Sequence, residues 1–136
     1  MKTSVLRRTS PLPSQGKRAR EWAAIRRRIM PTLLERDGAR CVACHRGGEL
    51  DPAHMFGRPG SGACLGPIAD RPELVALMCR RDHDAIDRGE DTELRDRLRW
   101  EAVARLAEAE GVEVPSDAET PVEAVRMVAR LLEETR

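Results

Sequence analysis

The chain has 136 residues, enough for one small domain with appended helices, and its one Phe, two Trp and no Tyr limit the aromatic core. It contains no apolar run of transmembrane length and no apolar segment of a secretion signal at its start, so we expect a cytoplasmic protein without a membrane partner. The net charge of +1 conceals a gradient, since residues 1–40 carry 11 Lys or Arg against 3 acidic residues, whereas residues 101–136 carry 4 against 9. A basic first third is typical of a nucleic-acid binder, and the alternative is a solvated basic arm.

The N-terminal segment divides into an arm and a helix. Residues 1–16 are rich in Ser, Thr, Pro and basic residues and predict a disordered basic arm. Residues 17–38 predict a basic amphipathic helix with an apolar face that includes Trp22, and Pro31 is expected to kink or restart it. Its polar face, which DNA would contact, carries Arg26, Arg27 and Arg28.

Residues 39–89 predict two short strands and a short helix. Glu49 to Met55 and Leu74 to Met78 have strand length, and residues 57–72 contain four Gly and three Pro, which predicts an irregular loop between them. Arg80 to Arg88 predicts one or two helical turns that Gly89 ends.

Residues 90–136 predict a C-terminal helical extension. One amphipathic helix runs from Asp91 to Glu110, with Asp91 or Thr92 as its cap, and a capping box at Thr120 begins a second. Because this segment is acidic, we expect its helices to pack on the preceding core or to form a homodimer, rather than to contact DNA.

All four cysteines and all three histidines lie within the 47 residues from position 41 to position 87. Cys41-x-x-Cys44 has the spacing of a zinc knuckle, and Cys79 begins a second one, so the spacing favours a structural zinc over a disulfide framework. The fourth ligand stays open. Asp82 repeats the two-residue gap, His83 is the better zinc ligand by residue type, and the weaker candidates are His45 and Cys64.

The order of these residues resembles a known family. The chain carries, in order, Cys-x-x-Cys, a small residue followed by His54, an apolar strand, and Cys79-x-x-x-His83. This order resembles that of the HNH endonucleases, whose ββα-metal finger is often braced by zinc. The run from Leu74 to Asp84 is similar to the family's second strand and helix start, and residues 6–12 resemble phage-encoded members. The resemblance covers residues 40–88, and residues 90–136 carry none.

The resemblance implies an α+β fold, built as a small zinc-braced ββα-metal finger with flanking α-helices, and a metal-dependent DNA endonuclease activity. In it, His54 would be the general base, and His83 would hold a catalytic Mg²⁺ or Mn²⁺ with Asp87 or Asp51. The structural zinc ligands would be Cys41, Cys44, Cys79 and Asp82. Further phosphate contacts are expected from Arg58, Arg80 and Arg81.

Three positions depart from the family pattern, and one of them is Asp82, which stands where members have a Cys or His and should bind zinc more weakly. Ala53 stands where many members have a metal-binding Asp or His, and Glu73 stands near the place of the middle Asn. A second hypothesis is therefore a non-catalytic zinc module that binds DNA or a protein. A third, a thiol redox protein using Cys41 and Cys44, gives no role to the charge gradient or to the knuckle at Cys79.

Overall fold

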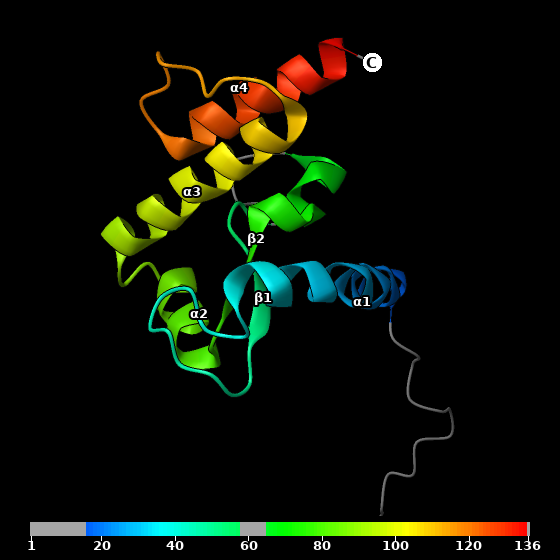
Figure 1. Cartoon of the computed structure of the whole chain (residues 1–136), viewed down its shortest axis with the longest axis vertical. Helices are drawn as coiled ribbons and strands as arrows, with labels where there is room; N and C mark the ends of the chain where they lie inside the picture. The colour runs from blue at the N-terminus through cyan, green and yellow to red at the C-terminus, as the bar shows by residue number, and fades with distance from the viewer. Residues whose placement is uncertain (1–15, 58–64, 136) are drawn as a thin grey trace, which may run out of the picture.

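The computed structural model describes residues 16–57 and 65–135. This part of the chain is a small mixed α+β structure with four α-helices and a two-stranded antiparallel sheet. Its elements in chain order are α1 (Lys17–Asp37), β1 (Asp51–His54), the 3-10 helices η1 (Gly66–Asp70) and η2 (Pro72–Leu74), β2 (Val75–Met78), α2 (Arg80–Asp87), α3 (Thr92–Glu110) and α4 (Pro121–Glu134). Figure 1 shows α3 and α4 side by side at one end, α2 toward the other, and α1 lying across the sheet. No helix among the described residues is long and apolar enough to cross a membrane.

The helix ends follow the signals in the sequence. The Asp91 side chain accepts a hydrogen bond from the backbone N–H of Leu94 at 3.0 Å and caps α3. The Thr120 hydroxyl accepts one from the N–H of Glu123 at 3.2 Å and caps α4, as expected from the capping box. At the end of α1, Gly38 adopts φ 72°, a left-handed conformation that glycine reaches without strain.

The sequence indicated a kink or a restart at Pro31, and the restart is wrong, because α1 continues through Pro31 to Asp37 as one helix. A proline inside a helix removes one backbone hydrogen bond to the carbonyl four residues earlier. Pro31 is exposed, so water can satisfy that carbonyl and one helix can span both halves of the segment.

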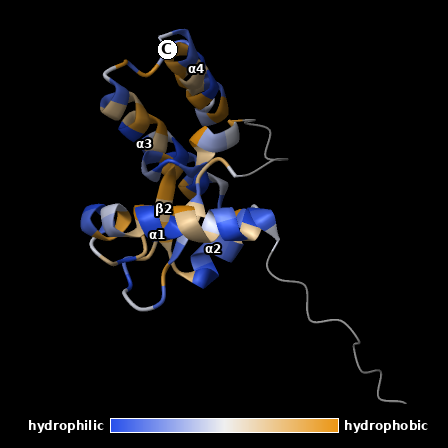
Figure 2. Ribbon diagram, turned by 90° about the vertical axis from the view of Figure 1, so that its right-hand side faces the viewer, coloured by the Kyte–Doolittle hydropathy of each residue, from blue (hydrophilic) through white to orange (hydrophobic). Residues whose placement is uncertain are grey.

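The sheet lies between two groups of buried side chains. In the antiparallel register, Asp51 pairs with Met78 and His54 pairs with Val75. One face packs on α3 and α4, and this larger core includes Ala53, Ala76, Met78, Leu98, Val103, Leu106, Val125 and Val128. The other face packs on α1, where Val75 and Leu77 contact Ile29 and Leu33. All four residues of β2 are buried, and Figure 2 shows β2 as a hydrophobic strand at the centre of the molecule.

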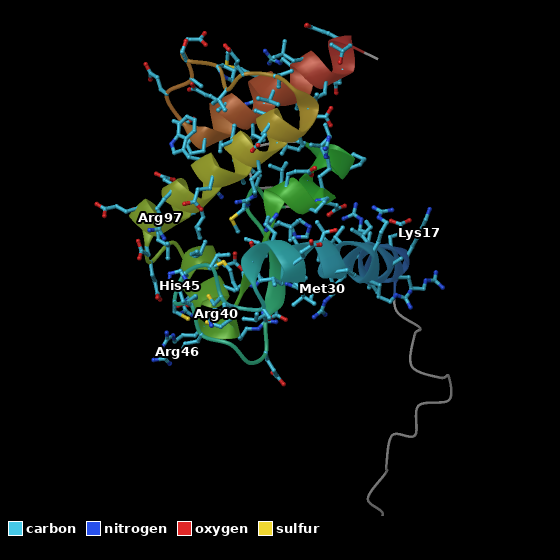
Figure 3. The ribbon with its side chains drawn as sticks, in the orientation of Figure 1. Lys17, Met30, Arg40, His45, Arg46 and Arg97 are labelled. Atoms are coloured by element: carbon cyan, nitrogen blue, oxygen red, sulfur yellow. The ribbon has the colours of Figure 1, made fainter. Side chains whose placement is uncertain are left out.

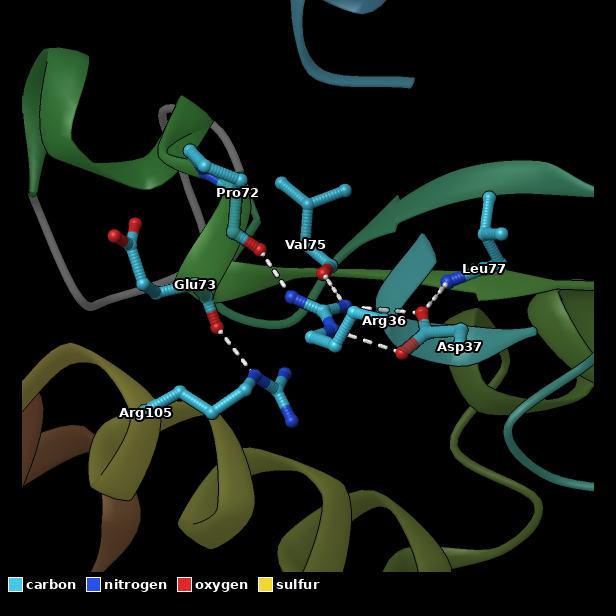
Figure 4. Close-up of polar contacts among 7 residues, drawn as sticks. All are labelled: Arg36, Asp37, Pro72, Glu73, Val75, Leu77 and Arg105. Atoms are coloured by element: carbon cyan, nitrogen blue, oxygen red, sulfur yellow. Dashed lines mark hydrogen bonds and ion pairs between the residues drawn. The ribbon is translucent and has the colours of Figure 1, made fainter. Parts of the chain in front are cut away.

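The outer edge of β2 is covered by the end of α1 (Figure 4). Arg36 donates to the carbonyl oxygens of Pro72 at 2.7 Å and Val75 at 2.6 Å, and Asp37 Oδ2 accepts from the N–H of Leu77 at 3.1 Å. An uncovered strand edge exposes backbone groups that invite pairing with another chain. These contacts satisfy that edge and fix α1 against the sheet.

The segment before β2 is more regular than the sequence indicated. The expected irregular loop over 57–72 contains η1 and the first residue of η2, and these helices have Pro67 and Pro72 near their starts. Its residues 58–64 lie outside the described ranges. Proline favours these short helices because its fixed φ suits the first turn of a helix. Arg105 of α3 also donates to the carbonyl oxygen of Glu73 at 3.0 Å, so the segment is held against α3 (Figure 4).

Candidate functional site

Four side chains with metal-ligand chemistry gather where the α1–β1 loop meets the start of α2. Each of them offers one ligand atom, and these atoms all lie within 4.8 Å of one another, the residues being Cys41, Cys44, Cys79 and Asp82. The described cysteines form no disulfide, and the Cys44 and Cys79 Sγ atoms are 3.9 Å apart. We call these four residues the Cys/Asp cluster.

The first two ligands come from a tight turn. The N–H of His45 donates to the Cys41 carbonyl, and the N–H of Cys41 donates to the Arg46 carbonyl, both at 2.9 Å. His45 adopts φ 64°, which reverses the chain, and the N–H of Ala43 reaches Cys41 Sγ at 3.4 Å. This turn directs the two thiols of the Cys-x-x-Cys motif to one side.

The other two ligands come from the junction of β2 and α2. Cys79 directly follows β2 and is the N-cap residue of α2, while Asp82 lies in the first turn of that helix. The N–H of Val42 donates to the Leu77 carbonyl at 2.9 Å, which fixes the turn against β2. The 34 residues between Cys44 and Cys79 therefore separate two parts of one cluster.

The spacing of the ligand atoms suits a tetrahedral zinc ion. Zinc bonds of about 2.3 Å to sulfur and about 2.1 Å to oxygen place sulfur atoms about 3.8 Å apart, and sulfur about 3.6 Å from oxygen. Cys44 and Cys79 Sγ lie 3.9 Å apart, and Asp82 Oδ2 lies 3.3 Å from Cys41 Sγ and 3.1 Å from Cys79 Sγ. The cluster is thus compatible with a structural metal such as zinc, with small shifts of the carboxylate.

The electrostatics of the cluster also favour a cation. The pKa of the Cys79 thiol is raised to about 11, because a hydrogen bond from the Asp82 backbone, which lowers it, is outweighed by burial and by the neighbouring carboxylate and thiols. The pKa of Asp82 is lowered, because the thiols of Cys44, Cys79 and Cys41 donate to its carboxylate. A divalent ion at the centre would deprotonate the thiols and neutralise the crowded anions.

His83 lies outside the cluster. Its Nε2 is 3.4 Å from Asp87 Oδ2, one helical turn further along α2, and its Nδ1 is buried without a hydrogen-bond partner in the described part of the chain. Of the two alternatives for the fourth ligand, the geometry therefore brings Asp82 and not His83 to the three cysteines. The side chain of His83 stays available for a second site, together with Asp87.

His54 occupies the end of β1 and is held from two sides. Its Nε2 is 2.7 Å from Asp70 Oδ1 at the end of η1, and its ring lies 4.4 Å from the Trp22 ring of α1, with an angle of 47° between the planes. Only 13% of the His54 side chain is exposed. These contacts orient the imidazole, as a general base requires. Neither Asp70 nor Trp22 belongs to a local motif, so the sequence did not predict their contacts with His54.

A cavity of about 180 Å³ opens beside His54. It is lined by His54 and by residues of α2 and α3, among them Ile86, Asp87, Arg95, Leu98 and Arg99. The structure thus brings His54 and Asp87 to one cavity, although 32 residues separate them in the sequence. It adds two arginines that sequence analysis did not single out.

Asp51 does not lie in this cavity. Its carboxylate is 2.9 Å from Arg80 Nη2 and 3.9 Å from Arg26 Nη2. Because side chains alternate along a strand, residues three positions apart such as Asp51 and His54 point to opposite faces. The structure therefore does not bring Asp51 to His54 or to His83.

The other basic residues expected to contact DNA lie mostly on the surface. Arg27 and Arg28 are exposed on α1, Arg81 is paired with Asp82 at 3.6 Å, and Arg58 lies outside the described residues, as does the N-terminal arm. Figure 3 shows further exposed basic side chains around the loop of the Cys/Asp cluster, namely Arg40, His45 and Arg46. The basic surface therefore extends from α1 to the loop beside α2.

Searches against known protein families, curated proteins and solved structures return no match to this chain.

Proposed function

We propose that the protein is a metal-dependent DNA endonuclease of the HNH type. The observation that carries this proposal is the arrangement at the His54 cavity, where His54, whose imidazole is oriented by Asp70, lines the same space as Asp87 and two arginines. Phosphodiester hydrolysis needs a base for water, a cation at the phosphate and a positively charged site for the substrate. The chain order of β1, β2 and α2 also agrees with the expected finger.

In this proposal, the Cys/Asp cluster holds a structural zinc. Three thiolates and one carboxylate fill four coordination positions, which leaves none open for a substrate or a reactive water. Its role is to join the loop after α1 to the start of α2. The chemistry takes place at the cavity instead.

His54 is the proposed general base. Its Nε2 lies 2.7 Å from Asp70 Oδ1, and in the proposed tautomer Nε2 donates to this carboxylate and Nδ1 accepts the proton from water. The resulting hydroxide attacks the phosphorus atom and the bond to the 3′ oxygen breaks. The departing oxygen takes a proton from solvent water, which gives 5′-phosphate and 3′-hydroxyl ends. Asp70 stabilises the imidazolium that forms at His54, in the manner of other carboxylate–histidine pairs.

A second divalent ion, Mg²⁺ or Mn²⁺, would be held by His83 and Asp87. Among the described residues, no third Asp, Glu, His or Cys lies close enough to form a cluster with this pair. Mg²⁺ commonly binds to one or two protein groups and completes its shell with water and substrate phosphates. When bound, the ion would stabilise negative charge on the phosphate and on the leaving oxygen.

The test is nicking of supercoiled plasmid DNA by the wild type, with Mg²⁺ or Mn²⁺ and with EDTA. Two matched variants at equal zinc content are compared, His54→Asn and His45→Asn. His45 is an exposed histidine with a positive φ that Asn tolerates, so its replacement controls for the loss of any histidine. We expect metal-dependent nicking that only His54→Asn abolishes. Equal nicking by both variants, or none by the wild type, would refute the proposal.

A second candidate function is a non-catalytic zinc module that binds DNA. Ala53 favours it, because a metal-binding residue is absent directly before His54, and the pair of His83 and Asp87 lacks a third protein ligand among the described residues. This candidate predicts that a DNA duplex binds without cleavage and that His54→Asn binds it as tightly as the wild type.

A further inference from the structure

Two arginines of α3 line the His54 cavity, in a part of the chain where the sequence carries no recognisable motif. Arg95 and Arg99 are one helical turn apart and face the same side as Leu98, which is buried. His54 from β1 and Asp87 from α2 line the same cavity. The first half of α3 thus carries cationic residues at the cavity, ahead of the acidic residues 101–136.

Arg99 is fixed next to the proposed base. Its Nε donates a hydrogen bond of 2.7 Å to the carbonyl of Met55, the residue that follows His54, and its guanidinium lies 5.6 Å from the centre of the Phe56 ring. The bond uses Nε and leaves the two terminal nitrogens to contact a ligand. Burial, and then the charge of Arg95, lower the pKa of Arg99, so this cation lies in an environment that disfavours it.

Arg95 is incompletely satisfied. Its Nε is buried and has no hydrogen-bond partner within the described residues, since the nearest acidic oxygen, Asp96 Oδ1, lies 3.7 Å away. Two like charges four residues apart on a helix repel each other, and partial burial increases the effect. An arrangement that is unfavourable for folding is typical of a site whose ligand supplies the missing opposite charge.

We propose that Arg95 and Arg99 bind one phosphate group of the DNA backbone in the cavity and place it beside His54. The inference rests on the proposed function and deepens it, because it names the residues that contact the phosphodiester to be cut. The planar guanidinium matches the oxygen geometry of phosphate, and both side chains reach a space with room for about six water molecules at about 30 Å³ each.

The first experiment compares cleavage by Arg95→Gln and Arg99→Lys with cleavage by the wild type. A matched control is Arg126→Gln, which removes an exposed arginine of α4 that does not line the cavity. Arg99→Lys keeps the positive charge but loses the planar guanidinium group, which can donate two parallel hydrogen bonds to a phosphate. Thermal melting checks that each variant folds. We expect both cavity variants to lose at least about tenfold in kcat/KM, and the control to match the wild type.

The second experiment does not depend on cleavage. Inorganic phosphate is added to the wild-type protein, and the Nε–Hε signals of Arg95 and Arg99, assigned from the variants that lack them, are followed by NMR. We expect both signals to shift with one binding curve, and a short DNA duplex to displace phosphate. The Nε–Hε signal of Arg126 should not shift.

The two proposals fail in different ways. If the wild type cuts DNA and both cavity variants cut it equally well, the phosphate site is refuted and the nuclease stands. If the wild type does not cut DNA but phosphate shifts both signals, the nuclease is refuted and the phosphate site stands. Absence of both cleavage and signal shifts refutes both.

Discussion

The identity of the fourth ligand in the Cys/Asp cluster gives a sharp test of the structure. We predict that Asp82→Ala weakens zinc binding and that His83→Gln does not. Asp82 Oδ2 lies 3.3 Å and 3.1 Å from two sulfur atoms, whereas His83 does not belong to the cluster. By residue type alone, His83 would have been the better zinc ligand.

The expected size follows from the ligand count. Structural zinc sites in small domains bind with about 10–16 kcal/mol, or about 2.5–4 kcal/mol for each of four ligands. At 1.4 kcal/mol for each factor of ten, loss of one ligand weakens binding by about two to three orders of magnitude. A carboxylate binds zinc less strongly than a thiolate, so we expect a loss of about 100-fold for Asp82→Ala.

Competition with a chromophoric chelator measures the affinities, and elemental analysis measures zinc per chain. Asp82→Cys serves as the matched positive control, because it keeps a ligand at the same spacing and should bind at least as tightly as the wild type. The reasoning is wrong if His83→Gln loses zinc while Asp82→Ala retains it. That outcome would also remove His83 from the proposed catalytic ion site.

Three further predictions concern single side chains. Asp37→Asn weakens the bond to the N–H of Leu77 and should lower the free energy of unfolding by about 1–3 kcal/mol in urea denaturation, with an unchanged m-value. If the protein is the proposed nuclease, Asp70→Asn should lower kcat for DNA cleavage by about 10–100-fold with little change in KM, because the proposed role of Asp70 is to orient His54. Thr120→Ala should destabilise the protein by about 1 kcal/mol in the same denaturation assay, since it removes the cap of α4.

Local signals in the sequence predicted the helices well. The caps at Asp91 and Thr120 depend on side chains within three residues of the backbone groups that they bind, so the sequence contains all the information needed. The exception is Pro31, where one helix continues and does not restart. Its exposure decides the outcome, and exposure depends on how α1 packs on the sheet.

The metal cluster was predictable in part. Two residues separate Cys41 from Cys44, and two separate Cys79 from Asp82, and such short gaps place both ligands of a pair on one turn. The choice between Asp82 and His83 was not predictable from spacing and residue type, because these two criteria disagree. It depends on which face of α2 is turned toward the loop, and only the packed structure fixes that face.

The surroundings of His54 were not predictable from local patterns. Asp70 is 16 residues away along the chain, and Arg99 is separated from His54 by 45 positions. Both approach His54 because η1 and α3 pack against the sheet, and no spacing rule relates them to it. Sequence analysis assigned the basic contacts to the arginine cluster of α1, because consecutive charges form a visible pattern and Arg95 and Arg99 do not.

The Cys/Asp cluster and the histidine site are joined through α2. This helix has eight residues and no buried residue, whereas isolated helices shorter than about 12–15 residues are marginal in water. Its first turn contains Cys79 and Asp82, and its following turns carry His83 and Asp87. A metal in the cluster therefore stabilises the element that presents the proposed ligands of the catalytic ion. Zinc loss should consequently abolish cleavage through the unfolding of α2, while the core of α3 and α4, which does not include His83 or Asp87, persists.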